Sequence, residues 1–308
     1  MTTALITHPD CLGHVNPNGH PEQVARLDFV LNALDGIPLT KMLAPLAAES
    51  DLLLVHPKSY VDRIKAKAPD QGIVQLDEDT WMSKGSLAAA YRAAGAAVRA
   101  VDVVLGGEAQ NAFAAIRPPG HHAEKTTQMG FCLFGNVAIA AKYALEHHGL
   151  KRVAIVDFDV HHGNGTQDLL QEDERVLFIS SHQRPLWPGS GDPEDTGEFE
   201  NVLNIGFPPG SDGNLFRKVY ERDVFPRIDA FKPDLILVSA GFDAHRADPL
   251  AQLEFETDDF AWVTGRICDL ADKHCQGRVV SALEGGYDLE ALAESAAAHV
   301  RILEERGR

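Results

Sequence analysis

The chain has 308 residues, of which 44% are hydrophobic and 24% charged, a composition that suits a globular protein with a substantial core. Its formal net charge of −17 disfavours nucleic-acid binding, because contacts to phosphates need clustered Lys and Arg. No stretch long enough to span a bilayer is free of charged or turn residues, and the N-terminus lacks the features of a secretory signal. We therefore expect a cytoplasmic protein with no nucleic-acid or membrane partner.

Four cysteines occur, and none of them forms a C-x-x-C pair. They are too few to form a disulfide framework in a chain of this size, so a reducing compartment is expected, with each cysteine a small core or near-surface residue. The length suits one large α/β domain over residues 1–308, and the composition leaves a homo-oligomer open.

Short apolar runs rich in β-branched residues alternate with helix-like stretches along the chain. After an N-terminal strand, the predicted strands are Ala112–Ile116, Val153–Val160, Val176–Ser180, Val202–Ile205, Leu235–Ala240 and Val279–Leu283. The predicted helices are Ser86–Leu105, Asn136–His148, Leu215–Phe231, Asp258–Lys273 and Leu289–Glu305. Most of the strands lack polar alternation, which is typical of parallel strands covered on both faces. The pattern predicts one parallel sheet flanked by helices, with a long polar loop at residues 11–22.

Chemically active residues follow four of the predicted strands. In chain order they are His121 and His122, then Asp159 and His161, then Asp243, then Tyr287. Because ligands bind at the carboxyl ends of the strands in an open parallel sheet, we expect these side chains to share one rim.

A divalent metal site is predicted at this rim. Asp159 and His161 are two residues apart, so they face the same way on an extended strand end, and Asp243 arrives from another strand. One imidazole and two carboxylates suit a metal that keeps open positions for water and substrate. The alternative is an Asp–His hydrogen bond that only stiffens the strand end.

The adjacent histidines His121 and His122 suit proton transfer near neutral pH. Asp157 and Asn164 are available as their partners, and an Asp partner keeps its imidazole cationic more readily than an Asn partner does. Tyr287 follows two glycines and could donate to a developing oxyanion.

Two loop aromatics, Phe131 after Gly130 and Trp187 before a Pro-Gly pair, could form the walls of a narrow apolar slot. Packing is the alternative role for each.

The segments RPPGHHAEKTTQMGFC, VDFDVHHGNGTQD, SAGFDAHRADPL and EGGYDLEAL resemble the histone deacetylase superfamily in its class II-like bacterial branch. The resemblance runs from GHPEQVARL to the end of the chain. It implies the arginase–deacetylase α/β fold, with a parallel eight-stranded sheet flanked by helices, and one zinc ion per chain.

The resemblance also implies roles for individual residues. It makes Asp159, His161 and Asp243 the zinc ligands, and His122 the general base and acid of the histidine pair, with Asp157 behind His121. Tyr287 corresponds to the tyrosine that polarises the carbonyl. The residues expected to contact substrate or product are Phe131 and Trp187 at the acyl-lysine stem, Asp79 at the rim and Arg26 in an internal cavity that handles acetate. A structural potassium ion is expected near Asp157, Asp159, His161, Ser180 and Ser181, partly through main-chain carbonyls.

Three positions bear on competence and specificity. Asn164 stands where many members have Asp, which weakens the acidic support behind His122. Position 287 is Tyr rather than the His of a weakly active subgroup, so the site is expected to be catalytically competent. Leu250 occupies a gatekeeper position where acetylpolyamine specialists carry Glu, and a neutral residue there favours acetyl-lysine; packing is its alternative role.

Together these residues and the resemblance imply a zinc-dependent hydrolase that deacetylates N-acetylated amines, with acetyl-lysine side chains as the expected substrate. Three alternatives stay open: an acetylpolyamine amidohydrolase, a non-catalytic binder of acylated ligands, and an arginase-like manganese hydrolase, which would need a two-metal carboxylate cluster.

Overall fold

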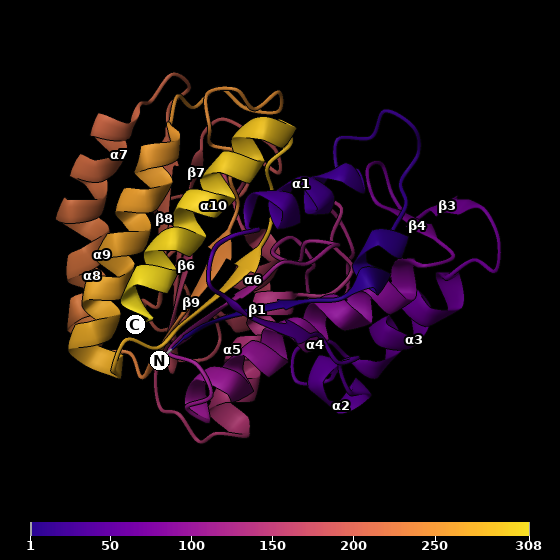
Figure 1. The fold of residues 1–308 in the computed structure, drawn as a ribbon, viewed down its shortest axis with the longest axis horizontal. Coiled ribbons are helices and arrows are strands. Elements are labelled where there is room, and N and C mark those ends of the chain that lie inside the picture. The colour runs from indigo at the N-terminus through magenta and orange to yellow at the C-terminus, as the bar shows by residue number, and fades with distance from the viewer. Residues whose placement is uncertain (1, 308) are drawn as a thin grey trace.

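The centre of the computed structural model, which describes residues 2–307, is a twisted sheet of eight parallel strands (Figure 1). In spatial order the strands are β2 (Thr40–Leu43), β1 (Thr3–Thr7), β5 (Asn111–Ala114), β10 (Val279–Leu283), β9 (Leu235–Ala240), β6 (Val153–Asp157), β7 (Val176–Gln183) and β8 (Val202–Phe207). Every neighbouring pair in this sheet is parallel. The predicted parallel sheet of about eight strands is therefore confirmed.

Helices cover both faces of the sheet. On one face α1 (Ala25–Ala33), α9 (Thr257–Cys275) and α10 (Leu289–Arg306) pack side by side, and on the other α4 (Ser86–Leu105) packs against α5 (Asn136–Glu146) (Figure 1). The shorter helical segments are η1 (Pro9–Gly13), α2 (Glu49–Leu52), α3 (Lys58–Lys67), α6 (Asn164–Leu170), α7 (Gly213–Val219), η2 (Tyr220–Val224) and α8 (Phe225–Phe231). Because both faces are covered, every residue of the four central strands is buried.

A small antiparallel hairpin stands apart from the main sheet, at the right of Figure 1. Its strands are β3 (Ile73–Gln75) and β4 (Trp81–Ser83), and the loop between them carries Asp79. The two ends of the chain lie close together, since the Thr3 hydroxyl donates to the Leu303 carbonyl at 3.0 Å.

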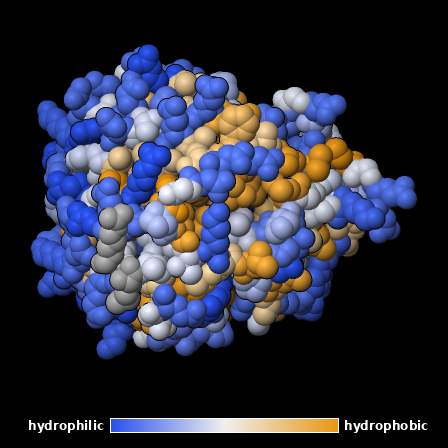
Figure 2. All heavy atoms as spheres, viewed as in Figure 1, coloured by the Kyte–Doolittle hydropathy of each residue, from blue (hydrophilic) through white to orange (hydrophobic). Residues whose placement is uncertain are grey.

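On the face drawn in Figure 2, hydrophilic side chains cover the helices at the left, and apolar side chains gather toward α1 and β4. No helix within residues 2–307 is long and apolar enough to cross a membrane. Cys11, Cys132, Cys268 and Cys275 are all buried and free, so they lie in the core, the first of the two expected positions.

One predicted strand is too long. The strand expected over Val153–Val160 ends at Asp157, because from Asp159 onward the amides turn to side-chain carboxylates instead of a neighbouring strand. The Asp159 N–H donates to Asp157 Oδ1 at 3.1 Å, and the Val160 N–H donates to Asp243 Oδ1 at 2.9 Å. Asp159 and His161 therefore lie on a loop, and the carboxylates that shape this loop belong to the site itself.

The helix predicted over Leu215–Phe231 is interrupted. It consists of α7, the π-helical turn η2 and α8 in succession. Pro226 has no N–H to donate to the carbonyl four residues before it, and the Phe225 N–H donates to the Tyr220 carbonyl, five residues back. The sequence pattern also missed the elements between residues 23 and 85, where helices and strands are short.

Candidate functional site

The four strands whose ends carry chemically active residues are consecutive neighbours in the middle of the sheet. They are β5, β10, β9 and β6, and all run in the same direction. The loops that follow them therefore meet at one edge, as predicted from the sequence.

Asp159, His161 and Asp243 form a compact group in which one ligand atom of each lies within 4.8 Å of the others. His161 Nδ1 lies 3.2 Å from Asp159 Oδ1 and 3.1 Å from Asp243 Oδ2. Both carboxylates are fully buried, and within residues 2–307 neither forms an ion pair with a lysine or arginine. Burying two carboxylates without a fixed cation is costly, so the donor set fits a divalent metal ion.

The electrostatics of this group show the same excess of negative charge. Burial and the neighbouring Asp159 carboxylate raise the pKa of Asp243. Burial alone would lower the pKa of His161, but hydrogen bonds to both carboxylates raise it to about 10. A proton on His161 thus balances part of the charge that a metal would neutralise, and binding of a metal at this nitrogen would release that proton.

The backbone holds the two carboxylates from several sides. The Gly285 N–H donates to Asp159 Oδ2 at 2.9 Å, and the His161 N–H donates to Asp159 Oδ1 at 2.9 Å. A Cβ at position 285 would lie 2.2 Å from Asp243 Oδ2 and 2.5 Å from Asp159 Oδ2. A glycine is therefore required where the chain after β10 passes the carboxylates.

The adjacent histidines make the contacts expected from the sequence, each with a different partner. His121 Nδ1 lies 2.9 Å from Asp157 Oδ2, and His122 Nδ1 lies 2.7 Å from Asn164 Oδ1. The two rings lie 3.9 Å apart between centroids, and the His122 ring lies 5.9 Å from that of His161.

The two imidazoles have opposite pKa shifts. Burial disfavours the cation in His121, but the carboxylates of Asp159 and Asp157 outweigh it and hold the pKa well above its usual value. In His122, burial and the positive charge on His121 hold the pKa well below its usual value. One buried ring is therefore cationic near neutral pH and the other is neutral, which suits an electrostatic and a proton-accepting role respectively.

A cavity of about 230 Å³ opens above these groups. Its lining consists of Asp79, His122, Gly130, Phe131, His161, Leu186, Trp187, Leu250 and Tyr287. The Trp187 ring stands nearly perpendicular to that of His122, with centroids 4.8 Å apart, and Phe131 meets Tyr287 edge-on at 5.9 Å. The structure thus brings the predicted aromatic residues to the walls of one slot that ends at the histidines.

Gly130 and Asp79 shape one side of this slot. Asp79 Oδ1 accepts the Gly130 N–H at 3.0 Å and the Thr80 hydroxyl at 2.8 Å. Gly130 has a positive φ of 56°, and a Cβ there would lie 2.4 Å from a carbon of the His122 ring. Asp79 is therefore at the rim, as expected, but one of its oxygens already orders the loop that carries Phe131.

Tyr287 is half-buried at the slot, and its hydroxyl forms no hydrogen bond with a described residue. Its main-chain N–H donates to Asp248 Oδ2 at 2.7 Å, and the Leu250 N–H donates to Asp248 Oδ1 at 2.9 Å. Asp248 thereby fixes both the tyrosine and the gatekeeper. Burial and the nearby Asp243 charge raise the pKa of Asp248 to about 7.

Arg26 lies outside the lining of the slot. Its guanidinium is fully buried over the Tyr287 ring, 5.0 Å from the centroid, and donates to the carbonyls of Glu284 and Gly286 at 2.5 and 2.6 Å. It also pairs with Glu22 at 3.0 Å. The role in handling acetate stays a prediction; the observed contacts support the turn that carries Tyr287.

Glu22 is the centre of a buried polar cluster beneath the site. Besides Arg26 it pairs with Arg117, and it receives the Asn16 side-chain amide at 2.8 Å. His14 Nε2 lies 3.3 Å from it. Because Arg117 precedes the histidine pair and Arg26 supports the tyrosine turn, one carboxylate connects two loops of the site.

Sequence reasoning missed several residues that hold the site, namely Glu22, Arg117, Glu124, Asp248 and Glu284. The carboxylate of Glu284 accepts the N–H groups of Gly120 and His121 at 2.7 and 3.2 Å. Each of these residues lies in or beside one of the motifs that carry the predicted site residues. Position next to those motifs was the one sequence signal that could have identified them.

The residues predicted to hold potassium lie on and beside β6 and β7. Asp157 and Ser180 are opposite one another in the pairing of β6 with β7. The Ser180 hydroxyl is hydrogen-bonded to the His182 ring, and the Ser181 hydroxyl is hydrogen-bonded to the Tyr220 hydroxyl at 2.7 Å. A potassium ion there would depend on main-chain carbonyls and stays a prediction.

Comparison with known proteins gives one consistent result. A family model of the histone deacetylase domain matches residues 20–303. A probable deacetylase of Archaeoglobus fulgidus is 41% identical over 299 residues, which covers 94% of this chain and 82% of that protein. The histone deacetylase-like amidohydrolase of Pseudomonas aeruginosa is 41% identical over 288 residues, with coverage of 92% and 74%.

A plant relative and a solved structure extend this similarity. The chloroplastic histone deacetylase 10 of Oryza sativa is 40% identical over 310 residues, covering 93% of this chain and 70% of that protein. The crystal structure of the HDA15 HD domain matches with a TM-score of 0.94 and 32% identity, over 99% of this chain and 88% of that chain. The fold expected from the motifs is therefore confirmed.

Proposed function

This chain belongs to the histone deacetylase superfamily, and from this premise we propose that it is a zinc-dependent enzyme that releases acetate from acetyl-lysine side chains. A hydrolytic deacetylase activity follows from the family itself. The observation that carries the finer proposal is the placement of a buried ligand triad, two unlike histidines and a tyrosine at the end of one apolar slot.

Asp159, His161 and Asp243 would hold the zinc ion. Their two carboxylates and one imidazole fit it, and three protein ligands leave positions for water and substrate. When bound, zinc would supply a Lewis acid for the amide carbonyl and lower the pKa of a water molecule. This is the one group of three metal-ligating residues found within residues 2–307, which favours a single-metal site over the two-metal cluster of an arginase-like enzyme.

The histidines divide the proton chemistry between them. His122, held neutral by burial and by the charge on His121, accepts the proton that the attacking water releases. His121, held cationic by Asp157 and Asp159, stabilises negative charge that develops beside it. A proton then passes from this pair to the departing nitrogen, which gives a free amine and acetate.

Tyr287 faces the same slot with a free hydroxyl. Its hydroxyl donates a hydrogen bond to the carbonyl oxygen as that oxygen gains charge in the transition state. Burial and the carboxylates of Asp243 and Asp159 raise the pKa of Tyr287 well above its usual value, so the phenol remains a donor at working pH.

The slot supports a lysine stem as the group next to the amide. Phe131 and Trp187 present apolar faces along it, and the neutral Leu250 lies at its mouth. An acetylpolyamine would bring a second cation to this mouth, where Asp79 is the acidic group of the lining.

A substrate panel tests this proposal. The zinc-loaded protein should give its highest kcat/KM with an acetyl-lysine peptide, compared with a longer acyl-lysine peptide and acetylputrescine, and a chelator should abolish turnover until zinc is restored. A preference for acetylputrescine would replace the substrate class. Zinc binding without turnover of any amide would identify a non-catalytic binder.

A further inference from the structure

Asn164, at the start of α6, lies between His122 and a carboxylate that the motifs did not single out. Its Oδ1 is 2.7 Å from His122 Nδ1, and its Nδ2 donates to Glu124 Oε1 at 2.8 Å. Nδ2 also lies 3.3 Å from the Met129 sulfur, which can only accept. The three side chains His122, Asn164 and Glu124 thus form a short hydrogen-bonded chain that leads from the slot to a partly exposed carboxylate.

The direction of every hydrogen bond in this chain follows from Glu124. An ionised carboxylate accepts hydrogen bonds and donates none, so the amide nitrogen of Asn164 must face it. The amide oxygen then faces His122, and His122 Nδ1 must be the donor. In a neutral imidazole this leaves Nε2 without a proton, as the atom able to accept one.

Without the carboxylate, the weakly accepting Met129 sulfur is the remaining partner that favours this order. With so weak an acceptor the amide can turn its nitrogen toward His122 Nδ1, and the turned amide would favour the tautomer with the proton on Nε2. His121 has no such ambiguity, because Asp157 contacts its Nδ1 directly at 2.9 Å. Without Glu124 the asparagine is therefore a weakly directed partner, and Glu124 supplies the stronger direction.

We propose that Glu124 is a positioning residue that sets the tautomer of His122 through Asn164. This inference rests on the proposed proton-accepting role of His122. It also means that Asn164 does not leave His122 without acidic support, because the Glu124 carboxylate lies directly behind the Asn164 amide.

Kinetics of Glu124→Ala in the zinc-loaded enzyme form the first arm of the test. The side chain is partly exposed, so the variant should fold, and its kcat should fall by about tenfold with little change in KM, since a hydrogen bond to a charged group is lost. The control is Asp168→Ala. The Asp168 carboxylate accepts the Lys125 N–H at 2.7 Å, so it contacts the same loop that carries Glu124. Asp168→Ala should leave kcat within about twofold, because loosening this loop does not redirect the amide.

The second arm compares the direction in which Glu124→Gln changes kcat in two backgrounds. In Asn164→Asp the new carboxylate accepts from His122 directly, and Glu124 becomes a like charge beside it. Adding Glu124→Gln should then raise kcat, whereas Glu124→Gln in the native background should not. A structural role for Glu124 predicts the same direction in both backgrounds, and that result would overturn the inference.

The third arm reads the tautomer without turnover. In ¹⁵N-histidine-labelled holoenzyme, the His122 signals, assigned by their loss in His122→Ala, should report a proton on Nδ1 and should shift toward a mixture in Glu124→Ala. Unchanged signals, or equal losses of kcat in Glu124→Ala and Asp168→Ala, contradict the inference. An inactive native enzyme with the expected tautomer would instead reject the proposed function.

Discussion

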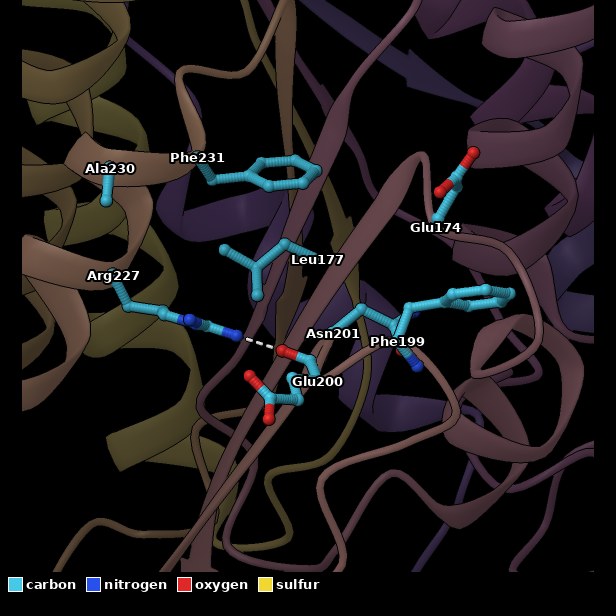
Figure 3. Close-up of a pocket in the computed structure, with 8 residues that line it drawn as sticks. All are labelled: Glu174, Leu177, Phe199, Glu200, Asn201, Arg227, Ala230 and Phe231. Atoms are coloured by element: carbon cyan, nitrogen blue, oxygen red, sulfur yellow. Dashed lines mark hydrogen bonds between the residues drawn. The ribbon is translucent and has the colours of Figure 1, made fainter.

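The two ends of the central sheet carry cavities of different chemistry. At the amino-terminal end, beside the starts of β7 and β8, a cavity of about 410 Å³ is bordered by Phe199, Phe231 and Leu177, and Arg227 donates to the Glu200 carbonyl across it (Figure 3). At the carboxyl end the slot measures about 230 Å³, and a second hollow of about 550 Å³ beside it shares Leu250 and Tyr287 with the slot. The amino-terminal space contains no histidine or cysteine, whereas the slot ends at buried groups with shifted pKa values.

Cavity volume therefore does not distinguish the two ends of the sheet, whereas the ionisable groups that line the cavities do. Buried ionisable groups are costly, and they persist where opposite charges, hydrogen bonds or a metal compensate for the loss of water. At the carboxyl end, such costly buried groups gather around Asp159, His161 and Asp243. Beneath them, Glu22 and its two arginines hold the loops of the site. Variants at the two ends should therefore differ strongly in effect.

The largest effect is expected for Glu22→Gln, which leaves Arg26 and Arg117 buried without their counter-charge. Unfolding free energy should fall by about 3–5 kcal/mol, as when one partner of a buried ion pair is removed. Burial would raise the pKa of Glu22, but Arg117 and the hydrogen bond from His14 hold it well below its usual value.

The pH dependence of this effect has a definite sign. A carboxylate whose folded pKa is depressed stabilises the protein above its unfolded pKa of about 4.3 and loses that contribution as the pH falls. Urea unfolding should show the difference between native and Glu22→Gln proteins shrinking below about pH 4. A difference that stayed constant with pH would show that the charge of Glu22 is not the cause.

The next effect in size is the loss of turnover in Tyr287→Phe. Removing one donor to a developing oxyanion costs about 10²–10³ in kcat. Zinc content and unfolding should stay near the native values, since the hydroxyl forms no hydrogen bond within the described chain. A Tyr287→Phe enzyme with native turnover would remove the tyrosine from the mechanism.

A smaller effect should follow from Trp187→Ala, which removes one wall of the slot. The ring is 42% exposed, so its loss should weaken substrate binding more than folding. We expect KM for an acetyl-lysine peptide to rise by about tenfold, from the apolar and aromatic contact that is lost. Steady-state kinetics check this, and a fall in kcat with constant KM would instead point to a role in placing the His122 ring.

The smallest effect is expected at the other end of the sheet. Arg227→Ala opens the amino-terminal cavity, yet turnover should stay within about twofold and unfolding free energy within about 0.5 kcal/mol, as is usual for an exposed side chain. A large loss of activity in this variant would break the contrast between the two ends.

The sequence predicted the part of the site that lies on strand ends. Parallel strands bring their carboxyl ends to one edge, so Asp243, Tyr287 and the histidine pair could be placed together without knowing any side-chain contact. The contacts of His121 with Asp157 and of His122 with Asn164 were also anticipated.

The residues that hold these groups in place could not be predicted in the same way. Glu22 meets Arg117 across 95 positions, and Asp248 meets Tyr287 across 39, with no periodic pattern to connect them. The strand expected over Val153–Val160 was too long because its apolar residues continue past the point where carboxylates capture the backbone. Such pairings depend on the folded loops rather than on local propensity.

A zinc titration of the metal-free protein, with acetyl-lysine peptide turnover as the readout and run beside His161→Ala, tests the proposed zinc site most directly. Native turnover should rise linearly and saturate at one zinc per chain, while His161→Ala should neither retain zinc nor gain activity. Native turnover that is independent of zinc, or a His161→Ala protein that keeps one zinc per chain, would contradict the proposed site.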